Sequence, residues 1–110
     1  MNYWQRWIGA WRKKTTGLTL LQRGAYSELL DAYYANERAL PMDRETVYRM
    51  VGAFNKAEQS AVDSVLANPD FFHENGGDLH NDRADEEIKK WQVFCEDQRR
   101  RRMGIKKPKR

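Results

Sequence analysis

The chain has 110 residues and a formal net charge of +4, and this length allows one domain with one hydrophobic core. Apolar residues make up 40% of the sequence, but no run approaches the 18 consecutive apolar residues of a membrane-spanning helix. The single Cys95 excludes an internal disulfide, and the first residues lack the layout of a secretion signal, so we expect a cytoplasmic protein.

The positive charge is concentrated at the C-terminus. Residues 99–110 contain eight basic residues and no acidic one, which leaves 12 basic and 16 acidic residues in the rest of the chain. Because the rest of the chain is mildly acidic, only the basic end offers many positive charges to the phosphates of a nucleic acid. In a basic domain such charges would be spread over the folded body. We therefore predict a folded domain over residues 1–98 and a disordered basic tail over residues 99–110.

The first segment is aromatic and then basic. Trp4, Trp7, Ile8 and Trp11 have helical spacing, while Gly9 and the short length also permit an extended strand. We expect an extended or single-turn segment whose tryptophans pack on the core, although a tryptophan beside arginine also suits stacking on nucleic-acid bases.

A helix over residues 18–37 is the predicted centre of the fold. Its apolar residues recur every four positions from Leu21 to Tyr33, which fits a helical period. Thr19 and Gln22 have the spacing of a capping box. Gly24 costs helix stability, so we expect another backbone to pass close to it.

Two shorter helices follow a connector that contains Pro41. Asp43 is the predicted N-cap of a helix over residues 44–51, which points Val47, Met50 and Val51 inward and ends at Gly52. Asn55 and Glu58 repeat the capping-box spacing before a helix over residues 56–67. The inward face of that third helix consists of Ala61, Val62, Val65 and Leu66.

The last third of the chain predicts a β-hairpin and a long helix. Asn75-Gly76 is a strong signal for a hairpin turn, and it places the two strands within residues 71–81. A helix over residues 83–102 follows, with acidic residues early and basic residues late, as the helix dipole favours. Its predicted apolar line is Ala84, Ile88, Trp91 and Cys95, flanked by Phe94.

Three helices followed by a two-stranded wing is the layout of a winged-helix domain, a relative of the helix-turn-helix. We therefore predict a mainly α fold with a small hairpin wing and a C-terminal helix. The N-terminal segment is a candidate third strand of the sheet. A plain helical bundle that carries a hairpin fits the same pattern.

The order of several short segments resembles the YdaU-like family. These segments are Trp7 with Trp11, then residues 18–34 (LTLLQRGAYSELLDAYY), residues 40–43 (LPMD), residues 62–72 and residues 79–88 (LHNDRADEEI). The family is a phage- and prophage-encoded domain of unknown function, frequent in replication regions beside helicase-loader genes. The resemblance covers about residues 3–95, and it implies a winged-helix protein of phage replication in a bacterial host, with no catalytic motif.

The residues themselves provide no enzyme signature. The sequence has no phosphate-binding loop of either glycine-rich type, and we expect neither catalysis nor a cofactor. His73 and His80 straddle the predicted hairpin turn, but with Asp82 or Asp85 they match no zinc spacing. The acidic cluster at the start of the last helix suits capping and the helix dipole better than magnesium.

Nucleic-acid binding is the first functional hypothesis. In a winged helix the third helix enters the major groove, and here its outward face offers polar residues but only one basic one. We expect the basic tail to supply most of the affinity for DNA, in a salt-sensitive way. The candidate DNA-binding residues are Arg12, Lys13, Lys14, Arg44, Arg49, Lys56, Gln59, Ser60, Arg99, Arg100, Arg101, Arg102, Lys106, Lys107, Lys109 and Arg110.

The second hypothesis is a protein-interaction module. The acidic body and the lack of basic residues at the wing tip suit docking to a helicase loader, to another replication protein or to a second copy of the chain. Trp91 and Phe94 on the last helix are the candidate contact residues for self-association. A basic face that joins Lys13, Lys14, Lys56 and the tail favours DNA, whereas acidic or apolar faces favour a protein partner.

Overall fold

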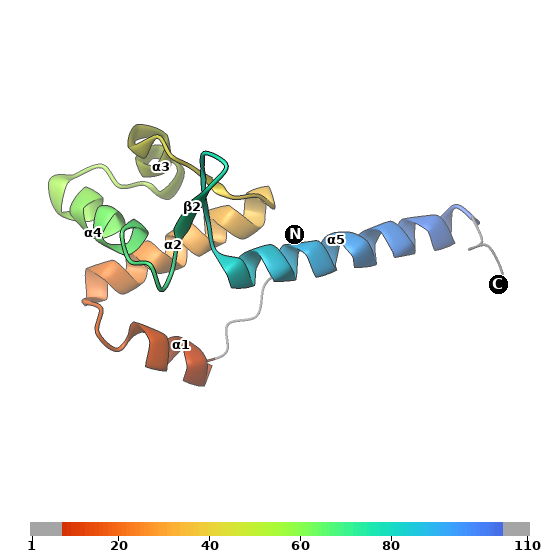
Figure 1. Ribbon diagram of the computed structural model, residues 1–110, viewed down its shortest axis with the longest axis horizontal. Coiled ribbons are helices and arrows are strands. Elements are labelled where there is room, and N and C mark those ends of the chain that lie inside the picture. The colour runs from red at the N-terminus through yellow and green to blue at the C-terminus, as the bar shows by residue number, and fades with distance from the viewer. Residues whose placement is uncertain (1–7, 105–110) are drawn as a thin grey trace.

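The computed structural model describes residues 8–104, which form five helices and three short strands (Figure 1). The elements are α1 (Ile8–Thr15), α2 (Leu20–Asn36), β1 (Leu40–Pro41), α3 (Arg44–Val51), α4 (Lys56–Leu66), β2 (His73–Asn75), β3 (Asp78–His80) and α5 (Asp82–Arg102). The fold is thus mainly helical with a small antiparallel sheet. None of the described helices has the length and apolar character needed to cross a membrane.

Helix α2 lies at the centre of the core, as predicted. Its residues Tyr26, Leu29, Leu30, Tyr33 and Tyr34 are buried on one stripe. The capping box is also confirmed. The Thr19 hydroxyl accepts a hydrogen bond from the backbone N–H of Gln22 at 3.1 Å, and the Gln22 side chain accepts one from the N–H of Thr19 at 3.0 Å.

The prediction for Gly24 is wrong. A Cβ built at this position would meet no atom within 4 Å, so no backbone passes close to it. Gly24 instead faces an open hollow beside α2, which is described below.

The described part of the N-terminal segment is helical rather than extended. Residues from Ile8 onward form α1, whose Trp11 ring stacks on the ring of Tyr26 with 5.1 Å between centroids. Thr15 is buried, and its hydroxyl donates to the backbone oxygen of Trp11 at 2.8 Å. Trp11 therefore packs against the core, as we expected, while Trp4 and Trp7 lie outside the described residues.

The third strand of the sheet comes from the connector and not from the N-terminal segment. Strand β1 pairs antiparallel with β3, which pairs with β2, so the strand order is β1-β3-β2. Pro41 lies in this edge strand, where its missing N–H removes no bond from the sheet interior. The hairpin turn consists of Gly76 and Gly77, both with positive φ (63° and 85°), one residue later than the Asn-Gly signal indicated.

Helices α3 and α4 begin near their predicted caps. Asn55 accepts from the N–H of Glu58 at 2.8 Å, whereas Asp43 makes no cap bond to backbone and accepts from the hydroxyl of Thr46 at 2.6 Å. Gly52 ends α3 with φ 75°, as expected. Met50, predicted to point inward, is exposed. The inward face of α4 is confirmed, because Ala61, Val62, Val65 and Leu66 are all buried.

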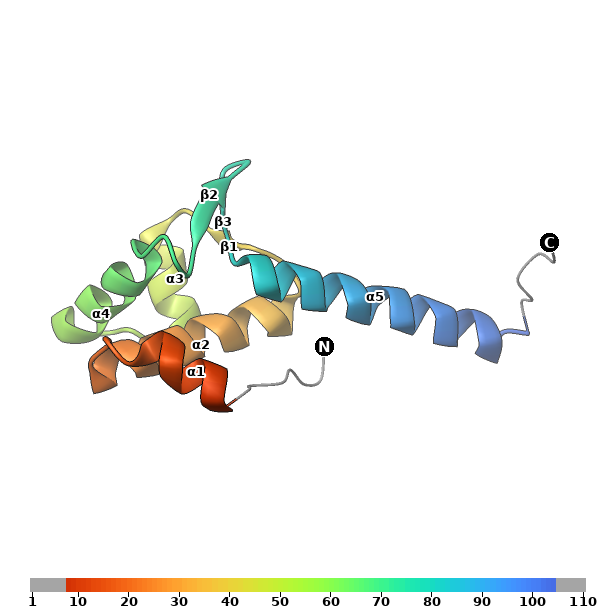
Figure 2. The same ribbon diagram turned by 60° about the horizontal axis from the view of Figure 1, so that its bottom comes forward.

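The molecule measures 56 × 31 × 22 Å along its three principal axes. Helix α5 projects from the body along the longest of these axes (Figures 1 and 2). Ala84 and Ile88 in its first half are buried. The predicted apolar line does not stay buried beyond them, since Cys95 and Phe94 are exposed. The helix predicted over residues 83–102 is confirmed and includes residues 99–102, which therefore do not belong to a disordered tail; residues 105–110 lie outside the described part.

Candidate nucleic-acid interface

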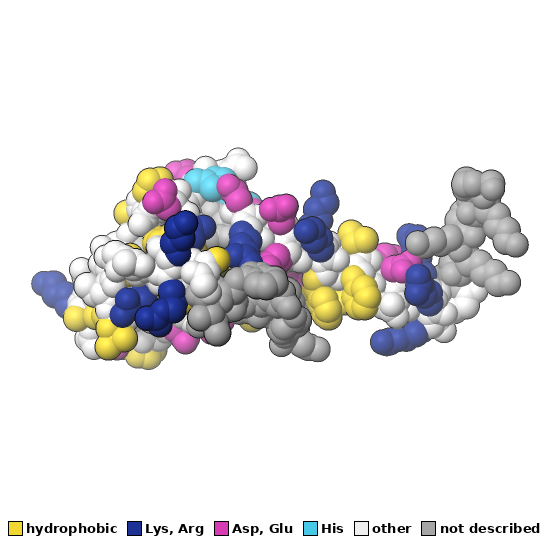
Figure 3. All heavy atoms as spheres, turned by 90° about the horizontal axis from the view of Figure 1, so that it is seen from below, with side chains coloured by type: hydrophobic (Ala, Val, Ile, Leu, Met, Phe, Trp, Pro, Cys, Tyr) yellow, Lys and Arg dark blue, Asp and Glu magenta, His cyan; other side chains and the backbone are white. Residues whose placement is uncertain are grey.

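The predicted DNA-binding residues are spread over four helices. Three lie on α1 (Arg12, Lys13, Lys14), two on α3 (Arg44, Arg49), three on α4 (Lys56, Gln59, Ser60) and four on the last turns of α5 (Arg99 to Arg102). Lys106, Lys107, Lys109 and Arg110 lie outside the described residues. Figure 3 shows the Lys and Arg side chains in separate groups, with apolar and acidic side chains between them. In this view no single basic face joins α1 to the far end of α5.

Arg44 is committed to an internal contact. Its Nε lies 3.3 Å from Oδ1 of Asp63, and the same carboxylate accepts a hydrogen bond from the hydroxyl of Tyr48 at 2.7 Å. This hydrogen bond to Asp63 raises the pKa of Tyr48, because it stabilises the protonated phenol. The cluster joins α3 to α4, so Arg44 has a contact within the fold in addition to its half-exposed position at the surface.

Helix α4 offers few groups to a nucleic acid. Lys56 and Ser60 are exposed, but the Gln59 amide donates to the backbone oxygen of Ala53 at 3.2 Å and thereby holds the connection before α4. Two acidic residues, Glu58 and Asp63, outnumber the single lysine on this helix. A helix with this charge makes a weak contact to the DNA backbone, where affinity depends on neutralising phosphates.

The basic end of α5 is exposed and helical. Arg99 lies 2.8 Å from Oε1 of Glu96, Arg100 lies 3.3 Å from the same oxygen, and Arg101 lies 3.1 Å from Asp97. These ion pairs lower the pKa of Glu96, with Arg99 as the main cause. Exposed pairs of this kind are worth little, so the arginines can exchange them for phosphate at small cost.

A polar network ties the start of α5 to the hairpin and to α2. Asp85 accepts a hydrogen bond from the Tyr33 hydroxyl, and its other oxygen lies 2.8 Å from Nδ1 of His80. The Tyr33 oxygen in turn accepts from the N–H of Asn81 at 3.1 Å. Burial, followed by the bond to Asp85, raises the pKa of Tyr33 well above its usual value.

The two histidines face each other across the hairpin, as predicted. Their rings stack with 6.0 Å between centroids, and His73 and His80 are partners in the strand register. His73 Nε2 lies 2.6 Å from Asp82. Within residues 8–104 there is no group of three or more side chains that is arranged to hold a metal ion. At the start of α5, Asp82 contacts His73 and Asp85 contacts Tyr33 and His80, while the N-cap of the helix is Asn81.

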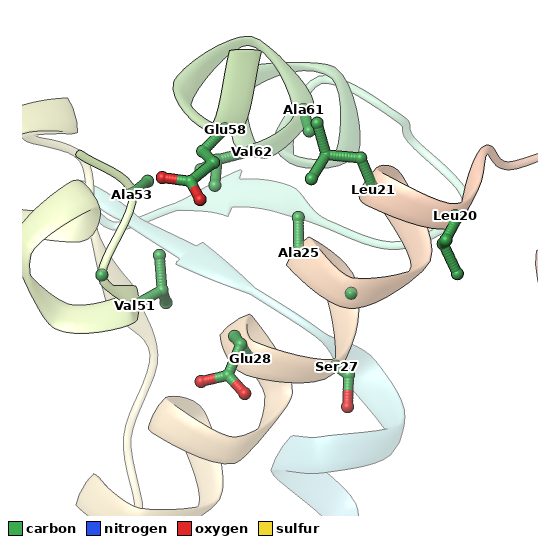
Figure 4. Close-up of a pocket in the computed structure, with 12 residues that line it drawn as sticks. Leu20, Leu21, Ala25, Ser27, Glu28, Val51, Ala53, Glu58, Ala61 and Val62 are labelled. Carbon is green, nitrogen blue, oxygen red and sulfur yellow. The ribbon is translucent and has the colours of Figure 1, made fainter. Parts of the chain in front are cut away.

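A surface hollow of about 530 Å³ lies between α2, α4 and the end of α3 (Figure 4). Figure 4 shows Leu20 and Leu21 at one end and Val51 and Ala53 at the other. Gly24 also lines the hollow. Leu20 is 80% exposed. The charged residues that line the hollow, Glu28 and Glu58, are both acidic, so it is unsuited to phosphate. Sequence periodicity missed this surface, because it assigned Leu21 to the buried stripe of α2.

The fold and the surface define a small, mainly helical domain with a three-stranded sheet and an exposed basic helix end. Comparison with protein families gives a match over residues 2–89 to the family described as protein of unknown function DUF1376, and the chain belongs to this family. No curated protein and no solved structure matches the chain significantly.

Proposed function

We propose that the chain is a DNA-binding accessory protein of phage or prophage replication, acting in the bacterial cytoplasm without catalysis or a cofactor. The observation that carries this proposal is the position of Arg99 to Arg102, which lie on the last turns of a helix that projects from an otherwise mildly acidic body. Four further basic residues follow in the sequence after Met103 and Gly104.

The order of elements supports a winged-helix assignment. Helices α2, α3 and α4 are followed by the β2–β3 hairpin, and β1 lies between the first two of these helices. Figure 2 shows the hairpin rising from the body beside α3, in the position of a wing. In such a domain α4 would be the helix that faces the major groove.

The charge distribution supports a division of roles between the body and α5. The body carries the polar groups of α4 that suit base edges, namely Ser60 and the neighbouring Ser64, but few phosphate contacts. The basic end of α5 offers four arginine side chains that suit phosphate, but it offers no polar groups placed to read base edges. We propose that the body sets orientation, while the basic end supplies most of the affinity.

The replication role rests on the segments that resemble the YdaU-like family. Genes for that family lie beside helicase loaders, so a protein that binds DNA and presents a folded body suits the assembly of an initiation complex. The description of the DUF1376 family assigns no function, and DNA binding is a function that can be tested for this member.

Fluorescence anisotropy with short double- and single-stranded DNA tests the proposal. The test variant replaces all four of Arg99 to Arg102 by glutamine in the full chain. The matched control replaces Arg12, Lys13 and Lys14 by glutamine on the exposed face of α1. We expect the α5 variant to lose at least tenfold in affinity and the α1 variant to lose much less, because neutralised phosphates at α5 dominate binding.

Two results would contradict the proposal. If the α5 variant binds DNA as tightly as the full chain, the basic end is not the source of affinity. If the unmodified chain binds neither form of DNA at low salt, the protein is not a DNA-binding protein.

A protein-interaction module is the second candidate function. It is favoured by the exposure of two apolar side chains, Val93 (64%) and Phe94 (53%), on the projecting half of α5. A helicase loader, another replication protein and a second copy of the chain are its candidate partners. A pull-down with the purified full chain and a Val93→Ser/Phe94→Ser variant tests for the loss of such a partner.

A further inference from the structure

One face of α5 points away from the body along the whole helix. Ala84 and Ile88 are buried and mark the face that contacts the body. Neighbouring residues of a helix differ by about 100° in direction, so positions 86, 90, 93, 97 and 101 lie roughly opposite to these two. We call these five positions the outer stripe: Glu86, Lys90, Val93, Asp97 and Arg101.

The outer stripe is accessible to a partner. Glu86, Lys90, Val93 and Arg101 are exposed, and Phe94 beside Val93 widens the apolar centre. Figure 3 shows the sequence of side-chain types along the projecting helix: basic nearer the body, then apolar, then acidic and basic toward the far end. The first three intervals of the stripe, of four, three and four residues, are those of a helix seam that packs against another helix, and Arg101 follows one further turn along.

The order of charges along the outer stripe is complementary to the same stripe in an antiparallel second copy. Along the chain they run acidic, basic, apolar, acidic, basic. When two copies of the stripe lie antiparallel, each acidic residue of one copy faces a basic residue of the other, and the apolar centres of the two copies face each other. In a parallel pairing every charge would instead meet its own like, which is destabilising.

We propose that the outer stripe of α5 binds the same stripe of a second copy of this chain in an antiparallel pairing. A two-fold axis between Val93 and Phe94 places Lys90 beside Asp97 of the second copy and Glu86 beside Arg101 of the second copy. Each of these pairs occurs twice by symmetry, and Val93 packs on Phe94 of the second copy. Such an interface is closed, so it produces a dimer and no filament.

The contacts that α5 makes in one copy are compatible with this pairing. Asp97 already lies 3.1 Å from Arg101 of its own helix through Oδ2. A carboxylate accepts several hydrogen bonds, so Oδ1 can also meet Lys90 of the second copy. The bodies of the two copies lie at opposite ends of the helix pair, because α5 projects from the body at one end only.

The pairing gives the second candidate function a definite partner, and it does not depend on DNA binding. A contact between two helices of this length is a small interface, and we therefore expect a dimer that dissociates on dilution. The pairing also covers Val93 and Phe94, and their burial is its apolar driving force.

Sedimentation equilibrium of the full chain, without DNA and over a range of concentrations, tests the inference. We expect a mass that rises from 13.1 kDa toward twice that value as concentration increases. Lys90→Glu and Asp97→Lys each turn two opposite-charge pairs into two like-charge pairs, so each variant should associate about tenfold more weakly.

Combining the two charge reversals, either in a mixture of the single variants or in one double variant, is the decisive experiment. In an equal mixture of the Lys90→Glu and Asp97→Lys variants, every antiparallel pair is again of opposite charge, and association should return. The double variant Lys90→Glu/Asp97→Lys should associate by itself. Lys13→Glu on α1 is the matched control, because it changes the net charge equally and lies off α5.

Three outcomes would overturn the inference. They are a monomer at all concentrations, a dimer that Lys90→Glu leaves unchanged, and a mixture of the two single variants that stays monomeric. Circular dichroism of each variant verifies that the helix content is retained. Because no DNA is present, these outcomes leave the DNA-binding proposal untouched.

Discussion

The two halves of α5 differ in what surrounds them. In the first half, Ala84 and Ile88 are buried, and Asp85 bonds to Tyr33 and His80. In the second half, Val93 and Phe94 are exposed and the ion pairs join neighbouring turns of the same helix. The first half therefore belongs to the hydrophobic core, whereas the second half is exposed, and it is the part for which we propose binding. One continuous helix thus carries both a structural and a proposed functional segment.

The largest expected contrast comes from truncating one apolar residue in each half. Ile88→Ala removes buried methylene groups and leaves a cavity, which should lower the free energy of unfolding by about 2–4 kcal/mol. Val93→Ala removes an exposed side chain and should change it by less than about 0.5 kcal/mol. Urea unfolding of dilute protein measures both, and equal effects would contradict the division of α5.

A smaller loss is expected when the polar network of the first half is broken. Tyr33→Phe removes the hydroxyl that accepts from the N–H of Asn81 and donates to Asp85. Leaving the buried N–H of Asn81 without this partner should cost about 1–3 kcal/mol in the same unfolding assay. Tyr48→Phe, whose hydroxyl bonds to the half-exposed Asp63, is the control and should cost less.

Alkaline unfolding provides an independent check on Tyr33 and Tyr34. Burial, and then the bonds to Asp85 and Glu87, raise the pKa of these two tyrosines above the usual value of 10.0. A raised pKa contributes stability that is fully present below pH 10 and lost as pH rises above it, because only the unfolded chain then ionises. Tyr33→Phe should flatten this decline, and an unchanged pH profile would show that Tyr33 is not held protonated by the fold.

The smallest effect is expected at the far end of α5. The Arg99 side chain lowers the pKa of the Glu96 carboxyl, and this stabilisation is present above the usual carboxyl pKa and lost as the pH falls through the lowered value. NMR titration of the Glu96 carboxyl should show a shift toward the usual range in Arg99→Gln. Thermal unfolding should be nearly unchanged, because the pair is exposed.

Local signals in the sequence predicted much of the fold. Thr19 with Gln22, Asn55 with Glu58 and the glycines of the hairpin act within a few residues, so their geometry follows from the chain itself. The central position of α2 also followed from periodicity.

Features that depend on distant partners were missed. Strand β1 forms only because Leu40 pairs with Leu79, and nothing in the connector alone signals that pairing. The segment around Trp11 is helical, although Gly9 and its length favoured an extended form in the sequence. The apolar line of α5 continues past the point where the body ends, and periodicity alone does not show where along the helix its burial stops.

The candidate site was predicted unevenly for the same reason. The charge run from Arg99 onward is visible in the sequence, and the helix predicted over residues 83–102 already included its first four arginines. Arg44 and Gln59 read as surface residues, while the structure commits them to Asp63 and to Ala53. Only the folded chain shows which basic residues remain available to a partner.

The salt dependence of DNA binding tests the central claim most directly. The measurement compares the slope of log K against log salt concentration for the full chain and for the variant with Arg99 to Arg102 replaced by glutamine. Each phosphate contact contributes about −0.9 to this slope, so the account predicts a slope that is shallower by roughly 2 to 4 in the variant. Equal slopes for the two proteins would contradict the claim that the projecting end of α5 holds the DNA.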